Sequence, residues 1–144
     1  MSSKRLVMPQ VTRVLETVLY VEGVTESARF YERVLGLLLM SKGDRFVAMS
    51  AGEGTVLLLF RRGGTASGAS SPGGWIPPHD STGPAHFAFA IRAEDLESWR
   101  EHLAAEDVEI ESEVNWDRGG TSFYFRDLDG HSVELATPGV WKVY

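Results

Sequence analysis

Three side chains that can bind a metal ion or move a proton occupy predicted β-strands: Glu16, His86 and Glu134. Glu134 lies between Val133 and Leu135, so a strand at this point places the two apolar side chains on one face and the carboxylate on the other. A carboxylate in such a strand is either solvated on an open face or directed into a cavity. If Val133 and Leu135 pack into the core, Glu134 faces the cavity and anchors a site.

His86 begins a second predicted strand, where it shares one face with Ala88 and Ala90 while two phenylalanines and an isoleucine share the other. We expect the aromatic face to pack on a helix, which turns His86 toward the interior of a cup. Glu16 begins the equivalent strand of the first half of the chain. These three residues, all of types that can bind a metal, are therefore predicted to point the same way.

The order of predicted elements is the same in both halves of the chain, strand–helix–strand–strand–strand. The predicted strands are 15–21, 37–41, 46–50, 55–60, 86–91, 109–114, 121–126 and 132–136, and the predicted helices are 25–35 and 94–105. We predict a single α+β domain over residues 1–144, in which two paired βαβββ modules form a cup-shaped, mostly antiparallel eight-stranded sheet with helices outside. Module one spans about 13–62, a Gly- and Ser-rich connector about 63–83, and module two about 84–138.

Charge and composition exclude several classes of function. The net charge is −6, so the chain lacks the basic surface expected of a protein that binds nucleic acid or an anionic membrane. There is no cysteine, so any metal must be held by histidine and carboxylate side chains. No apolar run is long enough for a signal peptide or a membrane span, and we expect a cytoplasmic protein.

Four segments resemble the vicinal oxygen chelate superfamily, which includes glyoxalase I, extradiol dioxygenases and the bleomycin and fosfomycin resistance proteins. These are Leu-Glu-Thr-Val-Leu-Tyr-Val at 15–21, Ala-Arg-Phe-Tyr-Glu-Arg-Val-Leu-Gly-Leu at 28–37, Gly-Pro-Ala-His-Phe-Ala-Phe at 83–89 and Phe-Arg-Asp-Leu-Asp-Gly-His-Ser-Val-Glu-Leu at 125–135. The resemblance covers about residues 13–138. It is specific for the fold and much less so for the reaction.

The resemblance implies a divalent metal ion (Zn, Mn, Ni, Fe or Co) held in the cup by Glu16, His86 and Glu134. Glu16 stands where the family usually has a histidine, which makes the ligand set richer in oxygen. This departure favours a lyase or isomerase over a ring-cleaving dioxygenase. Glu16 and Glu134 are also the candidates for proton transfer, and strand 55–60 lacks the fourth ligand that glyoxalase I carries there.

The remaining candidates are predicted to contact substrate. Tyr20 and Tyr124 are expected on the inner faces of their strands, and Arg118 lies in a loop where it could bind an anionic group. His79 follows two prolines in the connector and could close over the cup as a ligand or general base. We place His102 and His131 on the surface, and consider an ion pair with Arg126 as an alternative role for Glu16.

We therefore predict a metal-dependent enzyme acting on a small molecule that chelates the metal through oxygens. The alternative is a metal-free, drug-sequestering protein of the bleomycin resistance type. We expect a homodimer, because members of the family often pair modules between chains. Whether the cup forms within one chain or between two stays open at this stage.

Overall fold

The computed structural model describes residues 7–144, so residues 1–6 of the predicted domain lie outside the described part. Module one consists of β1 (Glu16–Val21), α1 (Val24–Leu35), β2 (Leu38–Lys42), β3 (Phe46–Ser50) and β4 (Val56–Arg61). The connector contains the hairpin β5 (Ala69–Ser71) and β6 (Gly74–Ile76). Module two consists of β7 (His86–Ala90), the short 3-10 helix η1 (Ala93–Asp95), α2 (Leu96–Ala105), β8 (Ser112–Asn115), β9 (Thr121–Arg126) and β10 (Ser132–Ala136). The α+β class and the two βαβββ modules are confirmed.

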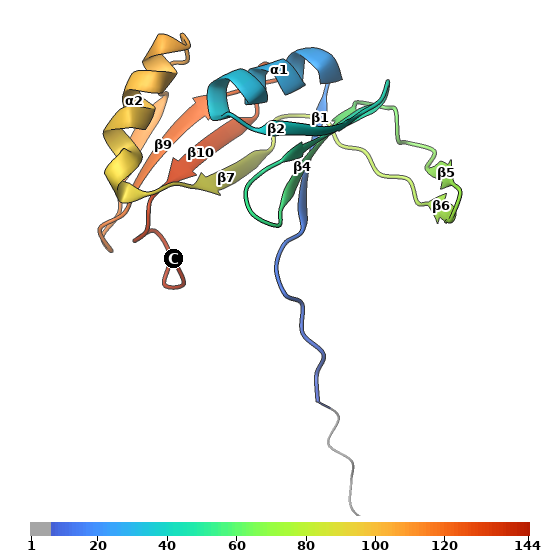
Figure 1. The fold of residues 1–144 in the computed structure, drawn as a ribbon, viewed down its shortest axis with the longest axis horizontal. Helices are drawn as coiled ribbons and strands as arrows, with labels where there is room; N and C mark the ends of the chain where they lie inside the picture. Colours follow the sequence, from blue (N-terminus) through green and yellow to red (C-terminus); the bar gives the residue numbers. More distant parts are fainter. Residues whose placement is uncertain (1–6) are drawn as a thin grey trace, which may run out of the picture.

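The eight module strands form two four-stranded sheets rather than one sheet of eight (Figure 1). Their orders are β1-β4-β3-β2 and β7-β10-β9-β8, so the first and last strands of each module are neighbours. β1 pairs with β4 and β7 with β10 in parallel, and the other pairs within these two sheets are antiparallel. The two sheets repeat one topology, as the sequence predicts.

Strand register shows which residues of the two modules correspond. In module one Val18 pairs with Leu58, two residues after the start of β1. In module two Ala88 pairs with Glu134, two residues after the start of β7. Leu58 therefore stands where module two has Glu134, which gives the two concave faces different chemistry.

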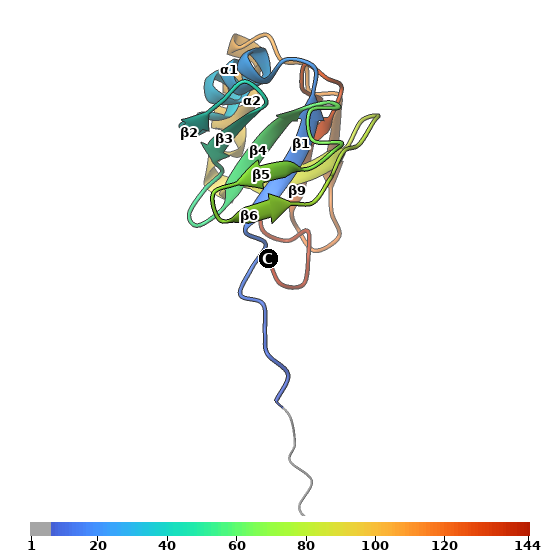
Figure 2. The same ribbon diagram turned by 90° about the vertical axis from the view of Figure 1, so that its right-hand side faces the viewer.

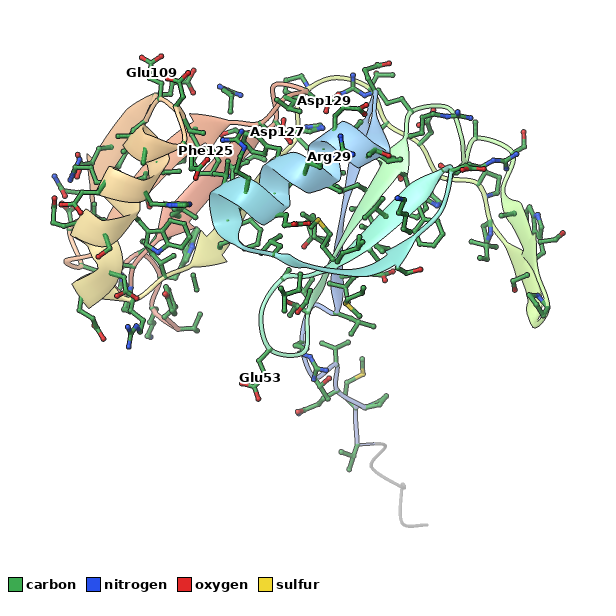
Figure 3. The ribbon with its side chains drawn as sticks, turned by 45° about the horizontal axis from the view of Figure 1, so that its top comes forward. Arg29, Glu53, Glu109, Phe125, Asp127 and Asp129 are labelled. Atoms are coloured by element: carbon green, nitrogen blue, oxygen red, sulfur yellow. The ribbon has the colours of Figure 1, made fainter. Side chains whose placement is uncertain are left out.

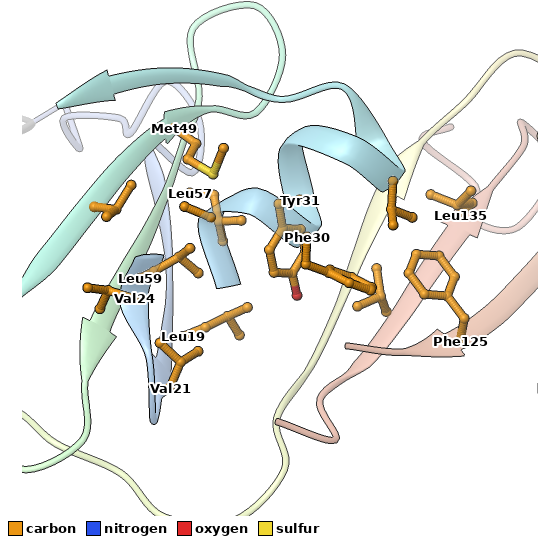
Figure 4. Packing of buried hydrophobic residues seen from close by; sticks show 14 of the residues in the cluster. Leu19, Val21, Val24, Phe30, Tyr31, Met49, Leu57, Leu59, Phe125 and Leu135 are labelled. Carbon is orange, nitrogen blue, oxygen red and sulfur yellow. The ribbon is translucent and has the colours of Figure 1, made fainter. Parts of the chain in front are cut away.

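The two modules share one hydrophobic core, which surrounds α1 (Figure 4). Phe30 and Tyr31 on this helix belong to the same buried cluster as Leu59 of β4 and Phe125 of β9. Burying a side chain of this size contributes about 1.5–3 kcal/mol relative to leaving it exposed. Gly36 ends the helix with a φ of 68°, and its N–H donates to the carbonyl of Glu32 at 3.0 Å.

The turn between β9 and β10, residues 127–131, connects module two to module one, and we call it the module-linking turn. Asp127 and Asp129 lie beside α1 in Figure 3. The Tyr31 hydroxyl donates to Asp127 Oδ2 at 2.6 Å, and the Glu22 N–H donates to Asp129 Oδ1 at 2.8 Å. These bonds fix the side-by-side arrangement of the modules within one chain.

His131, predicted to lie on the surface, is buried in this turn with a relative exposure of 1%. The Ala85 N–H donates to His131 Nδ1 at 2.8 Å, so this nitrogen is the acceptor of the ring. Nε2 then carries the hydrogen and donates to the Tyr20 carbonyl at 2.9 Å. The prediction was wrong because burial of His131 depends on the docking of module one, which local strand alternation does not encode.

His102, also predicted to be solvated, is half-buried on α2. Its Nε2 lies 2.9 Å from the carbonyl oxygen of Val34, near the end of α1. The ring therefore links the ends of two helices rather than facing water.

The connector crosses the concave side of module one, where its β5–β6 hairpin lies in front of the sheet that contains β1 and β4 (Figure 2). Thr65 is buried, and the N–H of His79 donates to the Thr65 carbonyl at 3.2 Å. The connector is thus an ordered part of the domain in the structure. Among the described residues, no helix is long and apolar enough to cross a membrane.

Candidate metal and substrate site

His86 and Glu134 meet on the concave face of module two. His86 Nε2 and Glu134 Oε1 are 3.2 Å apart, with the imidazole about half exposed and the carboxylate 9% exposed. Glu134 is directed to this face because Val133 and Leu135 on either side of it are fully packed in the core. The alternation in the sequence therefore determines where the carboxylate points.

The hydrogen bonds around His86 leave Nε2 as a ligand atom. Nδ1 is 3.0 Å from the Ser132 carbonyl, an oxygen that can only accept, so Nδ1 carries the hydrogen. Nε2 then faces the Glu134 carboxylate, where either a proton on Nε2 or a divalent cation bound to both side chains satisfies the contact. Their spacing suits two neighbouring ligands of a divalent ion with bonds of about 2.1 Å. This part of the site fits a metal.

Glu134 is itself held by side chains on β9 and the loop before it. Ser122, fully buried, donates from Oγ to Glu134 Oε2 at 2.5 Å. The Trp116 indole N–H donates to Ser122 Oγ at 2.8 Å. Because the indole can only donate, the hydroxyl hydrogen of Ser122 is left for the carboxylate. Ser122 and Trp116 were missed by sequence reasoning, although Ser122 alternates onto the same face of its strand as Tyr124.

Tyr124 lies beside this pair, as expected of an inner-face residue. Its ring stacks on His86 with centroids 6.0 Å apart and an interplanar angle of 28°. Burial and then the negative charge of Glu134 raise the pKa of the Tyr124 hydroxyl, which keeps it protonated at neutral pH. Arg118 is exposed in the loop that also carries Trp116.

Glu16 lies apart from the pair, in a cavity on the concave side of module one. Within residues 7–144, no three histidine or acidic side chains converge as a metal-binding group. Arg126, considered as a partner for Glu16, instead pairs with Glu111 at 3.0 Å. One chain thus brings together two of the three predicted ligands.

Tyr20 and His79 line the same cavity as Glu16. The Tyr20 hydroxyl and His79 Nδ1 are 2.5 Å apart, and Thr65 donates its hydroxyl to the His79 carbonyl. Burial and then the charge of Asp80 raise the pKa of Tyr20. The connector therefore places His79 in the cavity of module one, whose lining includes Glu16 and does not include His86.

Comparison with known proteins agrees with this fold and with the motifs. Residues 13–135 match the model of the Glyoxalase/Bleomycin resistance protein/Dioxygenase superfamily. The chain is 29% identical over 117 residues to the glutathione transferase FosA of Serratia marcescens, covering 81% of this chain and 74% of that protein. It is 28% identical over 130 residues to the metallothiol transferase FosB of Staphylococcus epidermidis, covering 89% of this chain and 83% of that protein.

Among solved structures, a lactoylglutathione lyase from Agrobacterium tumefaciens aligns with a TM-score of 0.84 and 27% sequence identity. The alignment covers 93% of this chain and 99% of that one. The fosfomycin resistance protein FosX from Listeria monocytogenes aligns with a TM-score of 0.65 at 20% identity, over 88% of this chain and 91% of that one, which supports the fold alone.

Proposed function

Because the chain belongs to the Glyoxalase/Bleomycin resistance protein/Dioxygenase superfamily, we propose that it is a metal-dependent enzyme acting on a small substrate that chelates the metal through oxygens. The observation that carries this proposal is the His86–Glu134 pair. The His86 ring is oriented by the hydrogen bond from Nδ1 to the Ser132 carbonyl, and the Glu134 carboxylate by the hydrogen bond that Oε2 accepts from Ser122. Relatives named as transferases and a lyase support a lyase, isomerase or transferase reaction over ring cleavage.

His86 and Glu134 would hold the metal, with Glu16 as a third ligand or as the base. When bound, a divalent ion supplies a Lewis acid that stabilises negative charge on a substrate oxygen. Glu134 is fixed by Ser122, so it suits a constant ligand. Glu16 is exposed at the start of β1 and has room to accept a proton from the substrate. Tyr124, kept protonated, can donate a hydrogen bond to a substrate oxygen beside His86.

The complete site would require a second copy of the chain. Tyr31 and His131 fix the two modules side by side in one chain, and Glu16 lies in a different cavity from the pair. A homodimer in which module one of each copy faces module two of the other would bring Glu16 to His86 and Glu134. The first strands β1 and β7 are both edge strands of their sheets, which leaves them open to such pairing.

Metal titration tests the proposal directly. Calorimetric titration of chelator-treated protein with Mn²⁺ and with Zn²⁺ is expected to give one ion per chain. Glu134→Gln and His86→Ala should each lower the affinity at least 100-fold, since each removes one ligand. Glu53→Gln, an exposed carboxylate on the loop after β3, is the matched control and should bind as wild type does. A wild-type protein that takes up neither ion would refute the proposal.

Mixing two variants tests the shared site. A Glu16→Ala chain supplies His86 and Glu134, and a His86→Ala chain supplies Glu16. If the site forms between chains, a co-expressed heterodimer contains one intact site and should bind half an ion per chain with wild-type affinity. If both Glu16 and His86 come from the same chain, every site in the heterodimer lacks one ligand and no wild-type metal affinity is restored. The heterodimer is isolated with two different affinity tags, and its mass is measured by light scattering.

A second candidate function, metal-free binding of a drug-like molecule, is favoured by the cavity in module one. The cavity is formed by one chain and is lined mainly by apolar side chains. Tight binding of a cationic aromatic compound that survives chelation, together with failure of the metal titration, would support this function over the enzyme.

A further inference from the structure

A cavity of about 880 Å³ lies between the concave face of module one and its connector. Val18 and Tyr20 of β1 form its floor with Leu58 and Phe60 of β4, and Ile76 and the residues that follow it come from the connector side. This volume is within the range of about 300–1,000 Å³ for sites that bind drug-sized ligands. All of these lining residues come from one chain, and in the proposed homodimer module two of the second copy would face them.

Aromatic side chains make one wall of this cavity. Phe46 and Phe60 stack with centroids 5.7 Å apart and an interplanar angle of 27°. Tyr20 lies 6.3 Å from Phe60, and His79 meets the same ring edge-on at 4.8 Å. Such a wall offers ring faces and edges to a flat aromatic ligand. Contacts between aromatic rings contribute binding free energy beyond that of the buried area alone.

The polar groups of the cavity suit a hydroxyl or a ketone. The Tyr20 hydroxyl and the His79 ring form one hydrogen-bonded pair, and each group can donate or accept. The pair is held in place because the backbone and hydroxyl of Thr65 bind the backbone of His79. A ligand oxygen placed near this pair would find a partner whichever hydrogen-bonding role it takes.

The charge around the cavity disfavours a strongly anionic ligand. Its charged lining residues are the acids Glu16 and Asp44 and the single cation Arg45. The two acids outnumber the one arginine, and the whole chain is acidic at −6. In the metal-free protein a phosphate or phosphonate dianion would therefore enter an unfavourable field.

We propose that this cavity binds the body of the substrate, and that this body is a neutral aromatic compound bearing a hydroxyl or keto oxygen. This inference rests on the proposed function, in which oxygen atoms of this substrate would bind the metal beside Glu16. Phe60 determines the preference for an aromatic body, and the Tyr20–His79 pair recognises its oxygen. The class excludes phosphonates as the preferred substrate.

Two probes that share one ring system test the proposal. Calorimetry with naphthalen-2-ol and with 2-naphthyl phosphate compares a neutral and an anionic form of the same aromatic body, in the presence of EDTA. We expect naphthalen-2-ol to bind wild type at least tenfold more tightly than the phosphate does. Phe60→Ala and His79→Ala should each weaken naphthalen-2-ol binding at least fivefold. Trp75→Ala, on the exposed hairpin, is the control and should leave it unchanged.

Three results would overturn the inference: no binding of naphthalen-2-ol to wild type, equal or tighter binding of the phosphate, or unchanged binding by both cavity variants. His79 lies on the connector rather than in the core, so its variant keeps the test decisive even if Phe60→Ala fails to fold. Metal affinity is measured on the same variants after EDTA has been removed. Loss of metal binding with intact probe binding rejects the proposed enzyme and not the cavity, and the reverse result rejects the cavity alone.

Discussion

The hydrogen bond from Tyr31 to Asp127 gives the sharpest test of how the two modules are held together. Tyr31→Phe removes one buried hydroxyl and keeps the ring that packs between the two sheets. Burial, followed by the charge of Asp127, raises the pKa of Tyr31, so the hydroxyl is a donor throughout the working pH range. The N–H groups of Asp129 and His131 donate to Oδ1 of Asp127, the oxygen that Tyr31 does not contact. Because the variant leaves these two bonds in place, the turn itself should persist.

The expected loss follows from the kind of bond removed. A hydrogen bond to a charged group contributes about 1.5–3 kcal/mol, and the 2.6 Å length in a buried setting places this one within that range. We expect Tyr31→Phe to lower the free energy of unfolding by about 2 kcal/mol. In a domain of this size that corresponds to a fall in Tm of roughly 6 °C.

Urea unfolding followed by circular dichroism measures this loss. Tyr144→Phe is the matched control, because its hydroxyl donates only to neutral backbone carbonyls and its expected loss is about 1 kcal/mol or less. A loss below about 0.5 kcal/mol for Tyr31→Phe, or one no larger than that of the control, would refute the view that this bond links the modules.

Three further predictions concern packing and the site. Gly120→Ala should lower the free energy of unfolding by about 1–3 kcal/mol, because the added Cβ would lie 2.7 Å from the backbone of the C-terminal segment. Gly73→Ala has open space around it and should change that free energy by less than about 0.5 kcal/mol. Thermal unfolding of the two variants compares these effects. Leu59→Ala should cost about 2–5 kcal/mol in urea unfolding, and Leu38→Ala, 70% exposed, almost nothing. Ser122→Ala should weaken Mn²⁺ binding about 10–100-fold in calorimetry, since it releases the buried carboxylate.

The repeat and most of its elements could be predicted from the sequence, because local periodicity and turn residues determine them. Gly36 and Asp107, which follow the two helices, have φ values of 68° and 58°, as residues that terminate helices commonly do. The predicted helix 25–35 begins one residue earlier, at Val24, since Gly23 rather than Thr25 precedes its first turn. The connector hairpin was not predicted, because its short strands pair only with each other and carry no apolar alternation.

What the sequence could not determine is the placement of one module against the other. That placement depends on contacts between residues about 100 positions apart, such as Tyr31 with Asp127 and Tyr20 with His131. The same limit applies to the site. Strand alternation predicts that Glu16, His86 and Glu134 face concave surfaces, but only the arrangement of the modules decides which of these surfaces meet.

The shared core around α1 has a consequence for the history of this fold. Phe30 packs with Phe125, and Tyr31 packs with Phe87, so the helix of the first half is covered partly by the second half. A protein consisting of one such module would expose those aromatic rings to water. We expect that a gene for half of this chain could have encoded a stable product only by self-association. Duplication and fusion would then have replaced a contact between two molecules by a contact within one.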